Sequence, residues 1–297
     1  MRWATLGRGR FYFFLLMLPA VLYVVAWRIA PALYTILLSF TQYNIVYDSG
    51  PTWNHLQNYG RLLHDSGLLE SLRISVMFTG AATAVELLVG LGVGAFFDSD
   101  PPARNLLLGI FLLPMIMAPV VVGTIWAILF DPTIGPIPYL IQVLHGPRVE
   151  WLGSSVLALG GLVVADAWEW SPLLALLLFS AMQTIPREQY EAARVDGSSG
   201  WQLFWRVVLP QVRGMVIVAA GLRFMDALLE LDKVIVMTGG GPGASTGFVS
   251  YYVYRQAFQA YELGYASTVI TGLLVLLAVV YGLYLRNSSR MLRSANV

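Results

Sequence analysis

Charged residues are scarce in this chain. Only 12% of its 297 residues are Asp, Glu, Lys or Arg, and 57% are hydrophobic. Ordinary soluble domains contain about 25% charged and roughly 45–50% apolar residues, so the composition excludes that class and predicts a polytopic membrane protein. Cysteine is absent altogether, which excludes disulfides, thiolate metal sites and cysteine nucleophiles.

Patterns for catalysis and metal binding are also missing. The single lysine, Lys233, does not stand in a G-x-x-x-x-G-K-[ST] phosphate loop, so the chain has no ATPase of its own. The histidines, His55, His64 and His145, lack the spacing of a metal site. The net charge of +1 comes from dispersed residues, which argues against a nucleic-acid partner. We therefore expect no enzyme activity, no metal and no cofactor in this chain.

The sequence contains long runs of apolar residues. A helix needs about 20 apolar residues to cross roughly 30 Å of hydrocarbon, and six runs reach that length. Because these runs are continuous rather than alternating, they predict helices and exclude a transmembrane barrel. The sequence therefore predicts an all-α fold with six transmembrane helices: Phe11–Leu38, Ile74–Phe97, Asn105–Phe130, Ser154–Met182, Val207–Leu231 and Ser267–Leu285.

The basic residues predict the orientation. With the N-terminus inside, ten of the 18 basic residues lie in cytoplasmic segments and five lie outside, as the positive-inside rule favours. We therefore predict a multi-pass protein of the cell inner (plasma) membrane with both termini in the cytoplasm. The expected parts are a cytoplasmic N-terminus with the first span (1–40), a core of five spans (69–286) and a cytoplasmic tail (287–297).

A charged, glycine-punctuated segment interrupts the apolar pattern between the fourth and fifth spans. Pro186 suits the N-terminus of a helix, Gly197 suits its end, and a second helical run begins at Trp201. One interpretation is an ordinary amphipathic linker. The other is a cytoplasmic helical element, expected at 186–210, that docks onto a soluble partner.

This segment also carries a motif. Glu191-Ala192-Ala193 is followed after three residues by Gly197 and, nine residues later, by Val207-Val208-Leu209-Pro210. The pattern resembles the EAA loop of permease subunits in binding-protein-dependent ABC importers, although Val207 stands where isoleucine is commoner. Further stretches resemble the sugar-importer branch, of the maltose and glycerol-phosphate permease type: Pro31 to Phe40, Asn58-Tyr59, Leu113-Pro114, Pro119-Val120-Val121 and Thr238 to Pro242.

The resemblance implies a type I ABC importer permease fold and a set of partners. These are a second homologous permease subunit, two ATP-binding subunits that hold ATP and Mg, and a soluble binding protein that delivers a sugar or polyol. It also implies that Glu191 contacts a basic residue of the ATPase subunit, that Ala192 and Ala193 allow close approach, and that Gly197 makes the turn. The ATPase-coupling residues are thus predicted to be Glu191, Ala192, Ala193, Gly197, Leu209 and Pro210.

Charged residues within the predicted spans form a second candidate site. A charge at the centre of a bilayer costs about 2.5–3.5 kcal/mol on insertion scales, so such residues face a cavity or a partner. Carboxylates accept hydrogen bonds from hydroxyl groups, and an aromatic face stacks on a sugar ring. The charged residues lie in the fourth and fifth predicted spans, and in the resembled family these two spans bear the substrate site. The resemblance therefore predicts these substrate-binding residues: Asp166, Glu169, Trp170, Arg223, Asp226 and Glu230.

Structural roles stay open for the same residues. Arg223 and Asp226 have the i,i+3 spacing of an ion pair that holds a helix bundle, and the tryptophans suit packing. Glu86 is expected to make a polar helix-packing contact. Asp232 and Lys233, at the membrane boundary, are expected to be solvated. Three glycines near Glu86 permit close helix approach: Gly90, Gly92 and Gly94.

Two further functions fit this sequence. An ion-coupled secondary transporter would use the carboxylates as relays and would need no ATPase subunit. A membrane scaffold or assembly protein would use the buried charges for structure alone. If the chain belongs to an importer, its acidic and aromatic residues favour a neutral sugar or polyol, whereas Arg223 leaves a phosphorylated substrate open.

Overall fold

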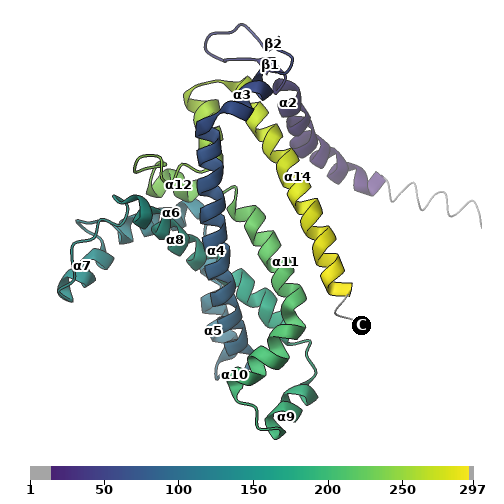
Figure 1. Ribbon diagram of the computed structural model, residues 1–297, viewed down its shortest axis with the longest axis vertical. Coiled ribbons are helices and arrows are strands. Elements are labelled where there is room, and N and C mark those ends of the chain that lie inside the picture. The colour runs from purple at the N-terminus through teal and green to yellow at the C-terminus, as the bar shows by residue number, and fades with distance from the viewer. Residues whose placement is uncertain (1–14, 294–297) are drawn as a thin grey trace, which may run out of the picture. The chain divides into compact units, whose positions relative to one another are not determined.

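The chain is helical almost throughout the range that its computed structural model describes, residues 15–293 (Figure 1). Residues 1–14 of the predicted N-terminal part and residues 294–297 of the predicted tail lie outside the described residues. The helices and strands are η1 (Val25–Ile29), α2 (Ala30–Leu38), β1 (Thr41–Gln42), β2 (Thr52–Trp53), α3 (Gln57–His64), α4 (Ser66–Asp98), α5 (Arg104–Phe111), η2 (Pro114–Ile116), α6 (Pro119–Leu129), α7 (Pro136–Val143), α8 (Ser155–Met182), α9 (Arg187–Val195), α10 (Gly200–Leu203), η3 (Phe204–Val208), α11 (Leu209–Ala227), α12 (Asp232–Met237), α13 (Val249–Tyr254), η4 (Arg255–Gln259) and α14 (Leu263–Arg293).

The chain divides into two compact units. Unit 1 comprises residues 1–65 and 253–276, and unit 2 comprises residues 66–252 and 277–297. Helix α14 therefore contributes its first part to unit 1 and its second part to unit 2. The motif-bearing segment and all predicted substrate-binding residues belong to unit 2.

Five helical stretches are long and apolar enough to cross a membrane: Leu15–Leu38, Ser66–Asp98, Ser155–Met182, Gly200–Ala227 and Leu263–Tyr284. The span predicted at Asn105–Phe130 is not among them, because the chain there forms α5, η2 and α6 in succession. Pro114 begins η2 and Pro119 begins α6, and Ala118 between them is extended, at φ −68° and ψ 136°. Proline disfavours a helical conformation at the preceding residue. The prediction of six spans is therefore not confirmed.

Helices α4 and α8 form the centre of unit 2 and run parallel to each other. Gly90 faces Leu174, and a Cβ at Gly90 would lie 2.9 Å from the Cβ of that leucine. One turn further along, a Cβ at Gly94 would lie 3.2 Å from the backbone nitrogen of Phe179. The two backbones therefore approach closely because these positions carry no side chain. The predicted role of the glycines is confirmed for Gly90 and Gly94, whereas Gly92 faces open space.

An apolar core joins these two helices to the later elements of unit 2. Phe78 of α4 packs against Phe248, with ring centroids 4.5 Å apart, and both side chains are fully buried. Leu162 of α8 and Val234 of α12 belong to the same cluster. Burial of such side chains stabilises each by about 1.5–3 kcal/mol relative to exposure in water, so α12 is fixed against α4 and α8.

Unit 1 contains a short antiparallel hairpin, which the all-α prediction did not include. Thr41 of β1 pairs with Trp53 of β2. The amide of Asn58, on α3, donates to the Thr41 carbonyl at 2.9 Å. The backbone of Gly264, at the start of α14, donates to the Tyr43 carbonyl at 3.1 Å. A side chain at Gly264 would collide with the Thr41 carbonyl, so glycine is needed where the hairpin meets α14.

Candidate functional site

The segment that carries the motif folds into two short helices with a glycine turn between them. Helix α9 begins directly after Pro186, and the following turn contains Gly197 at φ +80°, a conformation that L side chains rarely adopt. The hydroxyl of Ser199 accepts a hydrogen bond from the backbone of Gln202 at 3.3 Å. The side chain of Gln202 in return accepts one from the Ser199 backbone at 2.9 Å, which completes a capping box for α10.

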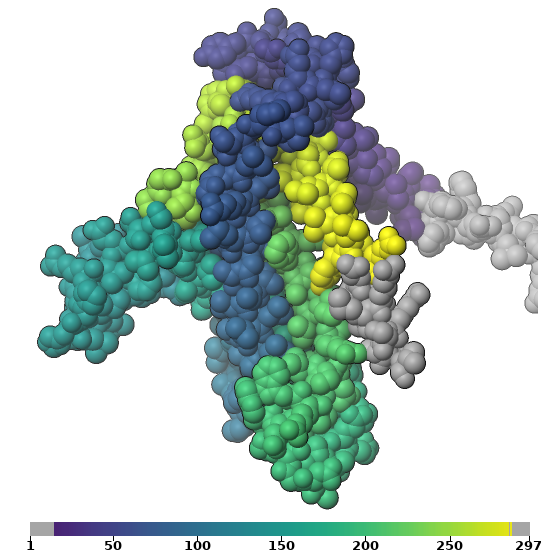
Figure 2. Space-filling view, viewed as in Figure 1, coloured from purple at the N-terminus to yellow at the C-terminus, as the bar shows by residue number. Residues whose placement is uncertain are grey.

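This segment presents an exposed surface with apolar side chains on it. Figure 2 shows α9 and α10 as the green lobe at one end of unit 2. Glu191 and Ala192 of the motif are exposed. Val195 is 87% exposed and Trp201 is 72% exposed. Two large apolar side chains are thus exposed in a segment that also carries charged residues.

A buried apolar cluster lies beneath the same segment. It contains five side chains from the end of α8, the connection to α9, the end of η3 and the beginning of α11: Leu178, Met182, Ile185, Val208 and Val212. The half-buried rings of Tyr190 and Phe204 pack against it. The cluster therefore joins the end of α8 to the beginning of α11, and the Tyr190 ring packs α9 against it.

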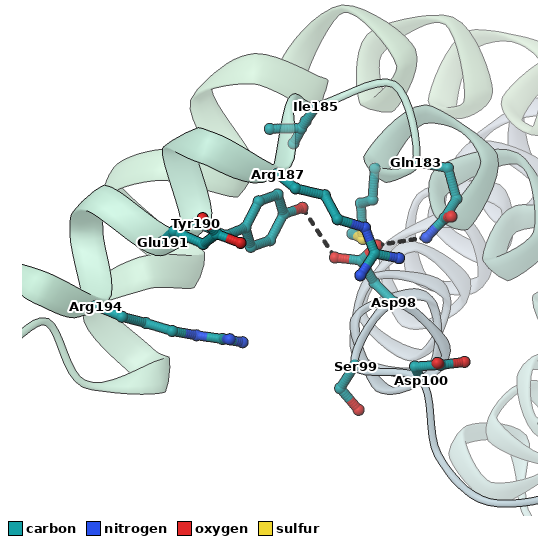
Figure 3. A pocket seen from close by; sticks show the side chains of 10 residues that line it. Asp98, Ser99, Asp100, Gln183, Ile185, Arg187, Tyr190, Glu191 and Arg194 are labelled. Carbon is teal, nitrogen blue, oxygen red and sulfur yellow. Dashed lines mark hydrogen bonds between the residues drawn. The ribbon is translucent and has the colours of Figure 1, made fainter.

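Asp98, the last residue of α4, attaches α9 to the same bundle. The Tyr190 hydroxyl donates to one carboxylate oxygen of Asp98 at 2.8 Å, and the Gln183 amide donates to the other at 2.7 Å (Figure 3). These groups border a cavity of about 220 Å³, whose wall also includes Glu191. Figure 3 shows the Arg187 side chain extending toward the same end of α4.

The Tyr190 hydroxyl stays protonated in this position. Burial and then the hydrogen bond to Asp98 raise the pKa of Tyr190 above its usual value. The phenol therefore remains a donor throughout the physiological pH range. Sequence reasoning missed this attachment, because one aspartate at the end of an apolar run is also typical of a solvated helix end.

The charged residues of the second candidate site form one network around two cations. Arg223 of α11 is the first cation. Its Nε lies 2.7 Å from Oε2 of Glu86 on α4, and its Nη1 donates to Asp226 at 2.7 Å. Its Nη2 donates to Asp166 on α8. The guanidinium carbon lies 5.0 Å from the ring centroid of Trp170, within cation–π range.

Lys233 of α12 is the second cation. Its Nζ donates to Oε2 of Glu169 at 2.6 Å. The same nitrogen lies 3.1 Å from Oδ1 of Asp166 and 2.9 Å from Oε2 of Glu230. Asp166 therefore bridges the two cations, and the network connects α4, α8, α11 and α12.

The network divides into a buried part and an accessible part. Five residues are at most 3% exposed: Glu86, Asp166, Glu169, Arg223 and Lys233. The Asp226 side chain is 62% exposed and that of Glu230 is 11% exposed. Oε1 of Glu86 has no hydrogen-bond partner among the described residues, and Oε2 contacts Arg223 without hydrogen-bond geometry. Five carboxylates surround two cations, so the network is rich in acceptors.

The structure brings together all six predicted substrate-binding residues, but it corrects the expectation for Lys233. That residue was expected to be solvated, yet it is fully buried and ion-paired. The reason is that α11, which falls within the fifth predicted span, ends at Ala227, and the chain then turns so that α12 packs into the bundle. Glu86 makes the expected packing contact, in the form of an ion pair with Arg223.

Comparisons with a family model and with individual proteins identify the same family. Residues 86–293 match the family described as binding-protein-dependent transport system inner membrane component. A trehalose/maltose transport system permease protein of Thermococcus litoralis is 30% identical over 90% of this chain and 91% of its own length. A sulfoquinovosyl glycerol transport system permease protein of Agrobacterium fabrum is 29% identical over 96% and 92%. A trehalose transport system permease protein of Mycobacterium tuberculosis is 27% identical over 90% and 86%.

Solved structures share the fold. A chain of a bacterial ABC transporter that imports alginate superimposes with a TM-score of 0.82 and 17% identity, over 97% of this chain and 98% of that one. A second structure of an alginate transporter, in complex with an alginate-pentasaccharide-bound periplasmic protein, gives 0.84 over 98% of both chains. The fold is therefore the mostly helical, polytopic permease fold.

Loss of the buried lysine is expected to destabilise the protein strongly. Lys233→Met leaves three carboxylates without their shared cation, and breaking a buried ion pair from one side costs about 3–5 kcal/mol. The melting temperature and the yield of monodisperse protein in detergent should fall. A double variant, Lys233→Met with Glu169→Gln, should recover part of the loss because it removes one uncompensated charge.

The matched control is Arg148→Met, since Arg148 is exposed outside the network. It should leave the melting temperature unchanged. Equal melting temperatures for Lys233→Met and the wild type would show that Lys233 does not hold the network together.

Proposed function

We infer the substrate and the partners of this chain from its family: it belongs to the binding-protein-dependent transport system inner membrane components. It is accordingly a multi-pass inner membrane permease of an ABC importer, a transport subunit and not an ATPase. We propose that it imports a neutral carbohydrate or polyol. Relatives named for trehalose, maltose, xylose and arabinose support an uncharged sugar, whereas one relative is named for sulfoquinovosyl glycerol, which carries a sulfonate.

The family match decides between the alternatives raised by the sequence. An ion-coupled carrier and a scaffold would both lack a dedicated ATPase partner. The present chain has a surface suited to one, because Val195 and Trp201 are exposed in the same segment as the exposed Glu191 of the motif. This surface is the observation that carries the proposal. Two ATP-binding subunits, which hold ATP and Mg, and a second homologous permease complete the proposed assembly, with both termini and the α9–α10 segment in the cytoplasm.

We propose that α9 is the coupling helix. It docks into a groove of an ATP-binding subunit, where Glu191 contacts a basic side chain and the small residues Ala192 and Ala193 allow close approach. Gly197 sets the turn, and the motif ends at Leu209 and Pro210, where α11 begins. Nucleotide binding in the partner would then displace α9 as a rigid element and shift α8 and α11 through the cluster beneath it.

The substrate site is proposed at the accessible side of the charge network. Asp226 and Glu230 offer carboxylate oxygens to sugar hydroxyls, and half-buried Trp170 offers an aromatic face. Asp166, Glu169 and Arg223 complete the predicted set and hold these groups in place through the ion pairs described above. Because the network is rich in carboxylates, it favours an uncharged polyhydroxylated substrate over a phosphorylated one.

Charge reversal in the coupling helix is expected to abolish transport without loss of the protein. Glu191→Lys places a cation against the proposed basic contact. Gly197→Pro cannot adopt φ +80°, because proline fixes φ near −65°. Both variants should lose uptake and transport-coupled ATP hydrolysis while their level in the membrane stays normal.

The matched control for charge reversal is Glu150→Lys, an exposed glutamate in the segment before α8. It should transport normally. Undiminished uptake by the Gly197→Pro variant would contradict the proposed coupling role.

The attachment at Asp98 is expected to set how tightly ATP hydrolysis and transport are coupled. Tyr190→Phe deletes the donor to Asp98 and keeps the ring packing, and a hydrogen bond to a charged group contributes about 1.5–3 kcal/mol. We expect fewer substrate molecules transported per ATP hydrolysed, together with a modest fall in the melting temperature because this bond also contributes to stability. Tyr139→Phe, at an exposed tyrosine of α7, serves as the control. If Tyr190→Phe transports as many substrate molecules per ATP hydrolysed as the wild type, the bond between Tyr190 and Asp98 does not contribute to coupling.

Asp226→Asn is expected to reduce uptake by about tenfold, the effect of losing one hydrogen bond to a charged acceptor. Arg223 keeps its contacts with Glu86 and Asp166, so the folded amount should not change. Uptake should be measured across trehalose, maltose, xylose, arabinose and sulfoquinovosyl glycerol. The control is Glu70→Gln, an exposed carboxylate at the start of α4. Equal uptake by Asp226→Asn and the wild type for every sugar would remove Asp226 from the substrate site.

A further inference from the structure

Unit 1 contains a polar cleft that the proposed transport mechanism does not use. Its volume is about 410 Å³, within the range of about 300–1,000 Å³ that is typical of small-molecule sites. The walls come from the hairpin and its loop, α3 and the beginning of α14, all within unit 1. Amide and aromatic side chains dominate the lining, among them Gln42, Tyr43, Asn44, Tyr47, Asn54 and Gln57.

We propose that this cleft binds a neutral saccharide of one or two rings, as a site separate from the one proposed within the membrane. The proposal rests on the proposed function, which places the chain in a carbohydrate importer and this part of it on the extracytoplasmic side. The cleft would hold the sugar where the binding protein releases it.

Asn54 forms a fixed and nearly buried part of the cleft wall. Its side chain lines the cleft and is only 8% exposed, yet its Oδ1 accepts no hydrogen bond among the described residues. Buried amide oxygens are normally paired. The position of Asn54 is fixed, because its backbone donates to Phe40 at 3.0 Å and accepts from Gln57 at 3.3 Å. Because Oδ1 itself is buried, Asn54 shapes the wall of the cleft, and contacts to a ligand come from its exposed neighbours.

The remaining lining matches the surface of a sugar. The exposed side chains of Gln42 and Gln57 each carry a donor and an acceptor, which together complement vicinal hydroxyl groups. Tyr47 is 85% exposed and offers an aromatic face for stacking. One wall is rigid, since Asn44 donates to Asp48 from its backbone at 2.6 Å and to the Ala260 carbonyl from its amide at 3.1 Å.

The charges of the cleft select against anionic ligands. Arg61 is the cation in the lining, and its Nη1 donates to Glu262 at 2.6 Å. The guanidinium also lies 3.8 Å above the ring of Tyr265. Asp48 adds a second carboxylate. With the cation neutralised and an extra negative charge present, a phosphate, sulfonate or uronate would be repelled, so the ligand is an uncharged sugar.

Saccharide binding to the full chain in lipid nanodiscs, with its co-purifying partner subunits and without ATP or binding protein, tests the proposal. Trehalose serves as the neutral probe and galacturonate as the anionic probe, both followed by saturation-transfer NMR. Gln57→Leu and Tyr47→Ala should each weaken trehalose binding by about threefold to tenfold, the effect of losing one hydrogen bond or one stacking contact. Both side chains are exposed, so these variants should fold. The matched control is Gln259→Leu, an exposed amide of unit 1 outside the cleft.

Each result has one meaning. Weaker trehalose binding in the two cleft variants, with the control unchanged, supports the site, as does trehalose binding that persists in Asp226→Asn. Unchanged trehalose binding in both cleft variants, or equally tight binding of galacturonate, overturns it. Cleft variants that keep trehalose binding but lose stimulation of ATP hydrolysis by the binding protein would also overturn it, by making the cleft a protein-docking surface. An absence of uptake for all sugars would instead refute the proposed function and leave the binding result intact.

Discussion

Unit 2 depends on the neutralisation of buried carboxylates by two cations. Arg223 and Lys233 are the only basic side chains that reach the interior among the described residues of this unit, and Asp166 contacts both of them. Burial of an ion is unfavourable by several kcal/mol unless it is well paired. The helices that contribute to the network are therefore constrained to positions at which every cation keeps its partners. Such a constraint favours a small number of discrete arrangements over continuous deformation, which is what an alternating-access mechanism needs.

The same helices also meet at the other end of unit 2. Helix α4 carries Glu86 within the network and Asp98 at the attachment of α9, twelve residues apart on one uninterrupted helix. At 1.5 Å per residue this is about 18 Å. Close packing against α8 at Gly90 lies between these two points. The proposed coupling segment and the proposed substrate site thus share a rigid element in addition to α8 and α11.

Much of this structure was predictable, and the failures have physical causes. Apolar length identified the long helices, and Pro186 and Gly197 located α9, because these signals are local. The break at Ala118 was missed because an apolar run of sufficient length was given more weight than two prolines. Five residues of the charge network were singled out from their spacing within the predicted spans, namely Asp166, Glu169, Arg223, Asp226 and Glu230, although Glu230 lies beyond the end of α11. Lys233 was misjudged because its burial depends on how α12 folds back, and no local pattern of the sequence contains that information.

Helix α4 is longer than the hydrocarbon core of a bilayer is thick. Its 33 residues extend over about 50 Å, whereas the hydrocarbon of a bilayer is about 30 Å thick. The excess of about 20 Å must be accommodated by tilting or by projection beyond the lipid, and the close contact with α8 limits how far α4 can tilt alone. Membrane thickness therefore acts on α4 and α8 together, so that the lipid composition of the host membrane becomes one of the forces that set the balance between the states of this permease.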